Sequence, residues 1–208
     1  MMFLVRVDKH GEFIFVCKDL ISRTSAFFRS ISCDNSWRPG LTIPVDLPGV
    51  DAESFRVYTH WVNTGKLVIE PCRCERFHEF HEQKSFIEAF ILGDILDDLR
   101  YRQHVIDVII ARLPSWTEFL PGDLVSRIWA ATQSGSPLRT FALRWMLVKH
   151  PGSFTLKVEN QALPKEFLAE ALSFMFERSA PETDEQCVDS LRQLLLTGSD
   201  GHHHQNES

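Results

Sequence analysis

Cysteines are few and apolar runs are short in this chain. Its 208 residues include five cysteines, three of them isolated along the sequence. An odd count of this kind does not form a disulfide framework. No apolar run approaches the roughly 18 residues of a membrane span, and residues 1–8 lack the basic and apolar regions of a signal peptide. We therefore expect an intracellular protein, cytoplasmic or nuclear, that binds no membrane.

An excess of positive charge is also missing. The formal net charge is −6, and the densest basic stretch, residues 100–102, is bracketed by Asp97, Asp98 and Asp107. Nucleic-acid binding usually requires a basic stripe that displaces counterions from phosphates. We therefore expect no nucleic-acid partner.

Recognised catalytic motifs are absent as well. Gly65-Lys66 lacks the earlier glycine of a phosphate-binding loop, and no Gly-x-Ser-x-Gly nucleophile elbow occurs. His78 and His81 are three residues apart, whereas the metalloprotease helix places its two histidines four apart. The sequence thus predicts a protein that is not an enzyme, with no catalytic residue and no cofactor.

Core-forming residues, by contrast, are plentiful. Hydrophobic residues make up 44% of the chain, including 16 Phe and 5 Trp. A globule of this size buries roughly 70% of its unfolded surface, so it needs neither metal nor disulfide to fold. Six aromatic residues stand at helical spacings and are expected in the core: Phe27, Phe28, Phe55, Trp61, Phe86 and Phe90.

The N-terminal segment has the pattern of a hairpin followed by helices. Residues 3–7 and 12–16 are rich in β-forming side chains around a turn that ends at Gly11. Apolar residues between Leu20 and Phe28 fall at helical offsets that a Ser/Thr-rich stretch interrupts. This pattern predicts two short helices rather than one long one.

The next segment alternates again between strand and helix patterns. Residues 41–47 alternate as a strand, and Pro44, which has no N–H to donate, predicts a position at the sheet edge. Asp51 is expected to cap a helix that residues 63–65 (Asn-Thr-Gly) terminate. Residues 66–69 are expected to form one further short strand.

The second half of the sequence has helical periodicity throughout. Ser85 and Glu88 have the spacing of a capping box, which predicts a helix start at Ser85. Asp97-Asp98 predicts a break before the next helix. Later helix starts are expected near Asp123, Ser136 and Pro164, and a last helix at residues 185–196.

These patterns predict an α+β protein. We expect a domain at residues 3–113 in which a small sheet packs against helices, and an all-helical extension at residues 114–197. The polar residues 198–208 are expected to form a disordered tail.

The order of the elements, with the residues that form them, resembles the BTB/POZ fold, in the version found in many fungal proteins. The resemblance spans about residues 4–178 and is carried by residues 15–28, 51–67, 90–99, 136–139 and 163–168, the last two being similar to the helical extension of fungal members. It implies a BTB/POZ-like sheet with packed helices. It also implies a non-catalytic adaptor or scaffold that binds other proteins.

Two positions depart from the family pattern. Cys17 stands where the family usually has a His before Lys18, and a small buried Cys is compatible with the fold. Members that recruit cullin ligases often carry a hydrophobic-x-Glu motif after the second helix. The nearest candidate, residues 37–39 (Trp-Arg-Pro), ends in Pro. A ubiquitin-ligase substrate adaptor, one alternative function, would therefore lack its usual cullin-binding Glu.

Surfaces for partner proteins are expected at the polar loop and the edge strand. Trp37 beside Arg38 has the composition of a binding hot spot. Ile43 and Val45 belong to the Pro-bearing strand, whose unpaired edge can accept a partner strand. Family homodimers commonly exchange a helix that precedes the first strand. Only two residues precede Phe3, so we expect self-association to be weak or to use another surface.

A metal-dependent regulator is the alternative from a different functional class. Cys72, Cys74, His78 and His81 lie within ten residues, and both residue types bind zinc. Structural zinc sites usually separate their paired cysteines by two to four residues, whereas one residue separates them here. The four residues are thus weak candidates, and no metal site is predicted.

Overall fold

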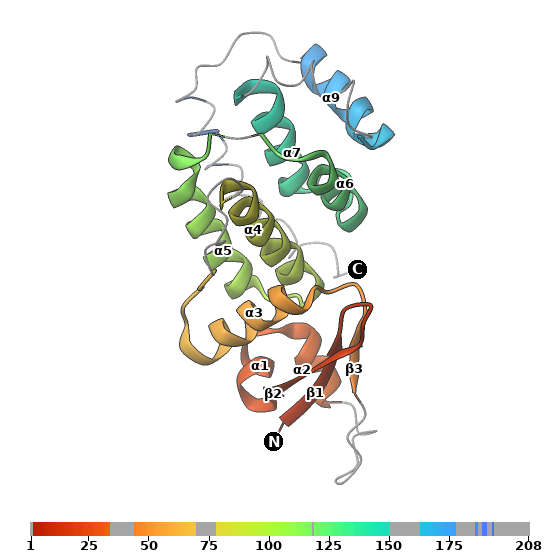
Figure 1. The fold of residues 1–208 in the computed structure, drawn as a ribbon, viewed down its shortest axis with the longest axis vertical. Helices are drawn as coiled ribbons and strands as arrows, with labels where there is room; N and C mark the ends of the chain where they lie inside the picture. Colours follow the sequence, from red (N-terminus) through yellow and green to blue (C-terminus); the bar gives the residue numbers. More distant parts are fainter. Residues whose placement is uncertain are drawn as a thin grey trace, which may run out of the picture. The chain divides into compact units, whose positions relative to one another are not determined.

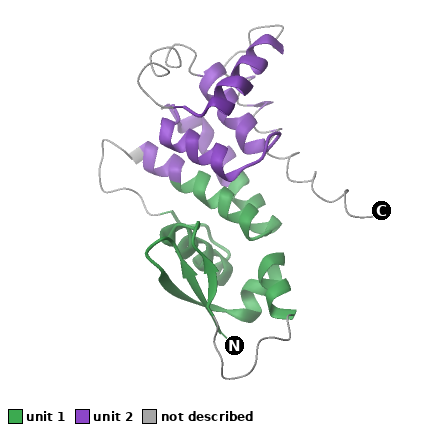
Figure 2. Cartoon of the chain, turned by 90° about the vertical axis from the view of Figure 1, so that its right-hand side faces the viewer, with its two compact units in different colours: residues 1–73, 85–107 green, residues 74–84, 108–208 purple. Residues whose placement is uncertain are grey.

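The computed structural model describes residues 2–33, 44–69, 78–117, 119–149 and 163–177, with the isolated helical positions 186, 189, 190 and 193. The chain divides into two compact units (Figure 2). Unit 1 comprises Met1–Arg73 and Ser85–Asp107, and unit 2 comprises Cys74–Lys84 and Val108–Ser208. The described part mixes helices with one small sheet, which confirms the α+β class.

The sheet of unit 1 contains three strands in the order β2-β1-β3 (Figure 1). β1 (Met2–Val7) and β2 (Glu12–Cys17) form the predicted antiparallel hairpin, and β3 (Val45–Leu47) pairs in parallel with β1. Gly11 closes the turn at a φ of 71°, where an L side chain would be strained. β3 lies at an edge, as Pro44 predicted.

Two short helices follow the hairpin, as predicted. α1 (Lys18–Thr24) and α2 (Ala26–Cys33) are separated by Ser25, whose backbone is extended. The buried Ser25 hydroxyl accepts a hydrogen bond from the Phe28 N–H at 3.1 Å and donates one to the Leu96 carbonyl at 2.6 Å. A small polar residue suits this position because its hydroxyl satisfies an N–H in the first turn of α2 and the distant Leu96 carbonyl at the same time.

α3 (Ala52–Thr64) begins and ends where the sequence predicts. The Asp51 carboxylate accepts from the Ser54 N–H at 2.9 Å, and Gly65 ends the helix at a φ of 72°. The strand expected at residues 66–69 is wrong, because these residues have no regular secondary structure.

α4 (His78–Ile95) and α5 (Leu99–Arg112) form the next helix pair, and the boundary between the units falls within each of them. The break at Asp97-Asp98 is confirmed: Asp97 has a φ of 45°. The start predicted at Ser85 is wrong, since α4 begins seven residues earlier and Ser85 lies in its interior. The physical reason lies in unit 2, where Glu79 and Glu82 of the first turns have hydrogen-bond partners.

The core of unit 1 is a row of aromatic side chains beneath the sheet. Ring centroids are separated by 5.5 Å between Phe3 and Phe28, 6.5 Å between Phe28 and Phe55, and 6.0 Å between Phe55 and Tyr58. Five of the six predicted core aromatics are buried, and Phe27 is half-buried. This row joins α2 and α3 to the inner face of β1.

All regular secondary structure among the described residues of unit 2 is helical. After the short 3₁₀ turn η2 (Leu113–Ser115) come α6 (Gly122–Ala131), α7 (Pro137–Arg144), its π-helical continuation η3 (Trp145–Lys149) and α9 (Lys165–Glu177). Trp116, Phe141 and Trp145 form its aromatic centre.

The helix starts predicted in unit 2 are largely confirmed. Ser136 caps α7 through the Leu138 N–H, and α9 follows Pro164. Asp123 differs, because α6 begins at Gly122 and Asp123 lies in its first turn. Of the predicted last helix, the four described positions are helical, and the rest, like the tail at 198–208, lies outside the described residues. No helix among the described residues has the length and apolar character to cross a membrane.

Candidate interaction surface

The outer face of the sheet is apolar over much of its area. Residues that stand opposite each other in β1 and β2 share a face, and Leu4 is opposite Phe15, Arg6 opposite Phe13, and Met2 opposite Cys17. Phe3, Val5 and Val7 alternate with these β1 residues and are fully buried. We call the outward-pointing set the outer sheet face: Met2, Leu4, Arg6, Phe13, Phe15, Cys17 and Asp46.

Two aromatic side chains dominate the outer sheet face. Phe15 is 66% exposed and Phe13 is 52% exposed, and Met2 beside them is 50% exposed. Leu4 and Cys17 are half-buried. Isolated exposed apolar residues are normal, but neighbouring large ones mark interaction sites. The outer sheet face therefore has the character of a docking surface.

An ion pair borders this apolar area. Arg6 Nε and Nη2 donate to Asp46 Oδ1 and Oδ2, both at 2.7 Å, because the two residues stand opposite each other on β1 and β3. Glu12, at the start of β2, pairs with Arg56 of α3. Each carboxylate is thus matched by a guanidinium. Glu12 opposes the inward-pointing Val7, so only the Arg6–Asp46 pair lies on the outer sheet face, and it adds no net charge there.

The predicted partner-binding residues are only partly described. Trp37, Arg38 and Ile43 lie outside the described residues. Val45 is in β3, and its side chain is 8% exposed because it faces the core. A partner at this edge would therefore contact the backbone of Val45 rather than its side chain.

The four candidate zinc ligands are likewise incompletely described. Cys72 and Cys74 lie outside the described residues, His78 begins α4 without a described side chain, and His81 is half-buried in α4. Among the residues that are described, no group of three His, Cys, Asp or Glu side chains is placed to hold a metal. The zinc hypothesis stays a prediction.

The glutamates between and beside these histidines, Glu79 and Glu82, have structural partners within unit 2. Glu82 Oε2 accepts from the Trp116 indole N–H at 3.0 Å. Glu79 accepts from the Thr117 backbone N–H at 2.6 Å and from its hydroxyl at 3.0 Å. The start of α4 is therefore held against the segment after α5, rather than forming the solvated insert that its polarity indicates.

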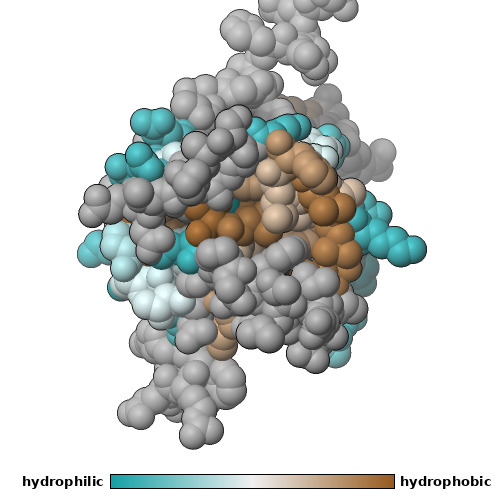
Figure 3. Space-filling model, turned by 90° about the horizontal axis from the view of Figure 1, so that it is seen from above, coloured by the Kyte–Doolittle hydropathy of each residue, from teal (hydrophilic) through white to brown (hydrophobic). Residues whose placement is uncertain are grey.

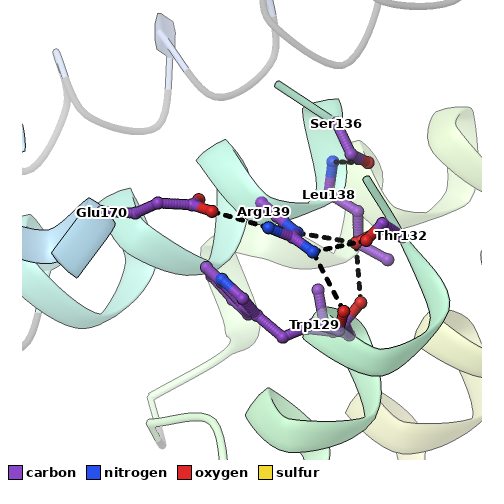
Figure 4. Close-up of polar contacts among 7 residues, drawn as sticks. Trp129, Thr132, Ser136, Leu138, Arg139 and Glu170 are labelled. Atoms are coloured by element: carbon purple, nitrogen blue, oxygen red, sulfur yellow. Dashed lines mark hydrogen bonds and ion pairs between the residues drawn. The ribbon is translucent and has the colours of Figure 1, made fainter. Parts of the chain in front are cut away.

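A buried arginine organises the helices of unit 2 (Figure 4). Arg139 of α7 donates from Nε to Thr132 Oγ1 at 3.2 Å, and from Nη2 to the carbonyls of Trp129 and Thr132 at the end of α6. Its Nη1 donates to Glu170 Oε1 of α9 at 2.6 Å. The guanidinium also lies 5.2 Å from the Trp129 ring. Every nitrogen has a partner, so this cluster holds three helices together.

A buried carboxylate plays a similar part in unit 1. Asp98 is 1% exposed, and it accepts from the Tyr58 hydroxyl at 2.8 Å and from the Tyr101 N–H at 3.0 Å. Burial, and then the charge of Asp98, raise the pKa of Tyr58 and the pKa of Tyr101. Tyrosines with raised pKa values stay neutral and are unsuited to act as proton donors near neutral pH.

A second apolar area occurs in unit 2. Figure 3 shows apolar residues gathered in one patch of the described surface, beside polar residues. Leu172, Met175 and Phe176 of α9 are exposed, Phe176 at 87%. Met175 and Phe176 follow Leu172 by three and four residues, so both lie next to Leu172 on the helix surface. Residues 150–162 and 178–185, before and after α9 in the sequence, are not described.

Sequence reasoning missed the exposure of Phe13 and Phe15. The signal was present: residues 13–16 (Phe-Ile-Phe-Val) are all apolar, so a strand there must be apolar on both faces. A hairpin in a three-stranded sheet with helices on one side buries only one of those faces.

No protein-family model matches the chain, and no curated protein matches it.

Proposed function

We propose that this chain is a non-catalytic protein–protein interaction module that docks partners on the outer sheet face. One observation carries the proposal: Phe13 and Phe15 stand side by side on the solvent face of β2, each more than half exposed. Aromatic side chains are enriched in the centres of protein interfaces, where their burial supplies much of the binding energy. The neutral Arg6–Asp46 pair beside them matches a partner surface that is apolar at its centre and polar around it.

The BTB/POZ-like identity is part of this proposal. It is supported by the order of hairpin, helix pair, edge strand, helix and helix pair, which the described residues follow from β1 to α5. The missing strand at residues 66–69 is the departure from the expected order. An adaptor or scaffold role follows from this resemblance and from the exposed aromatic pair together.

The polar clusters support a non-catalytic role. The Arg139 guanidinium donates to four acceptors. Asp98 caps α5 and binds Tyr58. A catalytic group needs a donor or acceptor atom that is not committed to the fold and can reach a substrate. These two groups instead use their hydrogen bonds to fix helices.

The test is affinity capture from a cell extract with three forms of the full chain. The wild type is compared with a Phe13→Ser/Phe15→Ser variant and with a Leu172→Ser/Phe176→Ser control, which changes exposed apolar residues of α9. Partners retained by the control and lost by the Phe13/Phe15 variant are the expected result. An identical set of partners for all three forms contradicts the proposal. A Trp37→Ala form tests the polar loop separately.

A further inference from the structure

β2 is an unprotected edge strand. It has six residues, contains neither Pro nor Lys, and carries its single charged residue, Glu12, at its first position. Within the described residues it pairs with β1 alone. The opposite edge is blunted, because β3 has three residues and follows Pro44. Proteins usually protect an edge by charge, Pro or short length, and β2 lacks these devices along most of its length.

The sequence of β2 is complementary to itself in an antiparallel pair. Along β2 the odd-numbered side chains lie on the outer face and the even-numbered ones on the inner face. Side chains that oppose each other across a strand pair lie on the same face, so a two-fold axis perpendicular to the sheet pairs odd-numbered residues with odd and even-numbered with even. When the two-fold axis passes beside Ile14, Ile14 of one copy opposes Ile14 of the other. Phe13 then opposes the partner's Phe15 on the outer face, and symmetry repeats this pair. Glu12 opposes the partner's Val16.

We propose that two copies of this chain associate through antiparallel pairing of their β2 strands about Ile14. The result is a six-stranded sheet whose outer face carries four phenylalanines in two cross-strand pairs. A self-complementary patch of this kind is what a two-fold interface requires. The inference rests on the proposed function, because the paired phenylalanines belong to the outer sheet face, and it names a second copy as the partner at the β2 edge of that face.

Charge and geometry both favour a second copy at this edge. The one carboxylate at the seam, Glu12, is already paired with Arg56 of its own chain. The two Glu12 side chains stand at opposite ends of the paired strands, so they do not repel each other directly. Arg6 and Asp46 neutralise each other across β1 and β3, away from the β2 edge. Pairing therefore places no unmatched charge next to the phenylalanines.

The mass of the full chain in solution tests association. Sedimentation equilibrium at micromolar concentration is expected to show a dimer for the wild type and a monomer for Phe15→Lys, because the lysine places two charges on the new sheet face. Phe176→Lys, a change at an exposed aromatic of α9, is the matched control and is expected to remain dimeric. Circular dichroism checks that both variants are folded.

The register is tested by a cysteine at the axis. Paired residues on antiparallel strands have Cα atoms about 4.5–5.5 Å apart, which is within the range that a disulfide spans. Ile14→Cys is expected to give a covalent dimer on mild oxidation. Val68→Cys, at an exposed position of the same unit, is the control that shows the background from the native cysteines.

The outcomes separate this inference from the proposed function. A monomeric wild type, or a Phe15→Lys variant that stays dimeric, overturns the β2 pairing. If the chain is monomeric but the Phe13→Ser/Phe15→Ser variant still loses captured partners, the proposed function stands and the second copy is not the partner. A dimer in which Ile14→Cys links no better than Val68→Cys overturns the proposed register.

Discussion

The Tyr58 hydroxyl donates to Asp98 at 2.8 Å within the core of unit 1, and this hydrogen bond joins α3 to the start of α5. Asp98 also caps α5 through the Tyr101 N–H. The carboxylate is fully buried, and these two donors satisfy one oxygen each. Burial of a carboxylate is costly unless such partners are present. The pair therefore fixes the position of α5, and removal of either side chain is expected to destabilise unit 1.

Removal of the Tyr58 hydroxyl is expected to destabilise the protein. Phe at position 58 keeps the ring packing but leaves one buried oxygen of Asp98 without its donor, which costs about 1–3 kcal/mol. Chemical denaturation of wild type and Tyr58→Phe measures the difference. Thr59→Val, which removes a hydroxyl from a half-buried position of the same helix, is the control. Equal midpoints for Tyr58→Phe and wild type would contradict the structural role of this hydrogen bond.

Alkaline pH is expected to destabilise the folded state. The pKa of Tyr58 and the pKa of Tyr101 are raised by burial and by the charge of Asp98, so the unfolded chain loses these protons first. Stability is full below the ordinary tyrosine pKa of about 10 and falls as pH rises above it, by up to about 1.4 kcal/mol per pH unit for each tyrosine. Denaturation midpoints measured from neutral to strongly alkaline pH check this.

The same tyrosines give a direct optical readout. The chain has only two tyrosines, so its tyrosinate absorbance reports Tyr58 and Tyr101 alone. We expect no ionisation of the folded protein near pH 10, followed by a cooperative rise when alkali unfolds it. In denaturant both tyrosines should titrate with the ordinary tyrosine pKa of about 10. Gradual ionisation of the folded protein with an ordinary midpoint would show that the two side chains are accessible.

The two faces of the sheet are expected to respond differently to truncation. Phe28→Ala removes a fully buried ring beneath β1 and is expected to cost about 3–5 kcal/mol. Phe15→Ala removes a ring that is 66% exposed, and its cost to the monomer should be well below that of Phe28→Ala. Denaturation at concentrations low enough to avoid association compares them. Similar costs at both positions would mean that Phe15 is buried in the folded chain.

Loss of Arg139 is expected to loosen unit 2. Arg139→Met keeps much of the apolar stem but leaves the Trp129 and Thr132 carbonyls and Glu170 without their donor. Removing one partner of a fully buried ion pair costs about 3–5 kcal/mol, and because Glu170 is half-buried we expect a cost at or below the lower end of that range. Glu170→Gln, which retains an acceptor for Arg139, is the milder control. Hydrogen exchange in α6 and α9 should increase in Arg139→Met and change little in Glu170→Gln.

Metal removal is expected to have no effect on stability. Glu79 and Glu82, which lie between and beside the candidate histidines, already bind Thr117 and Trp116. The start of α4 thus has partners that do not depend on zinc. Thermal unfolding of untagged protein with and without chelator should give the same midpoint. A lower midpoint with chelator, together with stoichiometric zinc, would instead support the Cys72, Cys74, His78 and His81 site.

Local sequence determined those elements whose ends are fixed by local chemistry. Asp51 caps α3 and Gly65 ends it because a carboxylate and a left-handed backbone act within a few residues of their own position. Ser136 and Pro137 start α7 for the same reason. The hairpin was equally predictable, since β-forming residues surround a short turn that ends at a glycine.

Tertiary structure decided which local preferences prevailed and which faces were left open. Ser85 has the spacing of a capping box, yet α4 extends to His78, where Glu79 and Glu82 bond to residues more than 30 positions away. Phe13 and Ile14 are both apolar, and only the packing of helices beneath the sheet determines which face of β2 is buried. Sequence thus determines the ends of elements through short-range hydrogen bonds. The exposed aromatic face arises because a three-stranded sheet with helices on one side can bury only one of its two apolar faces.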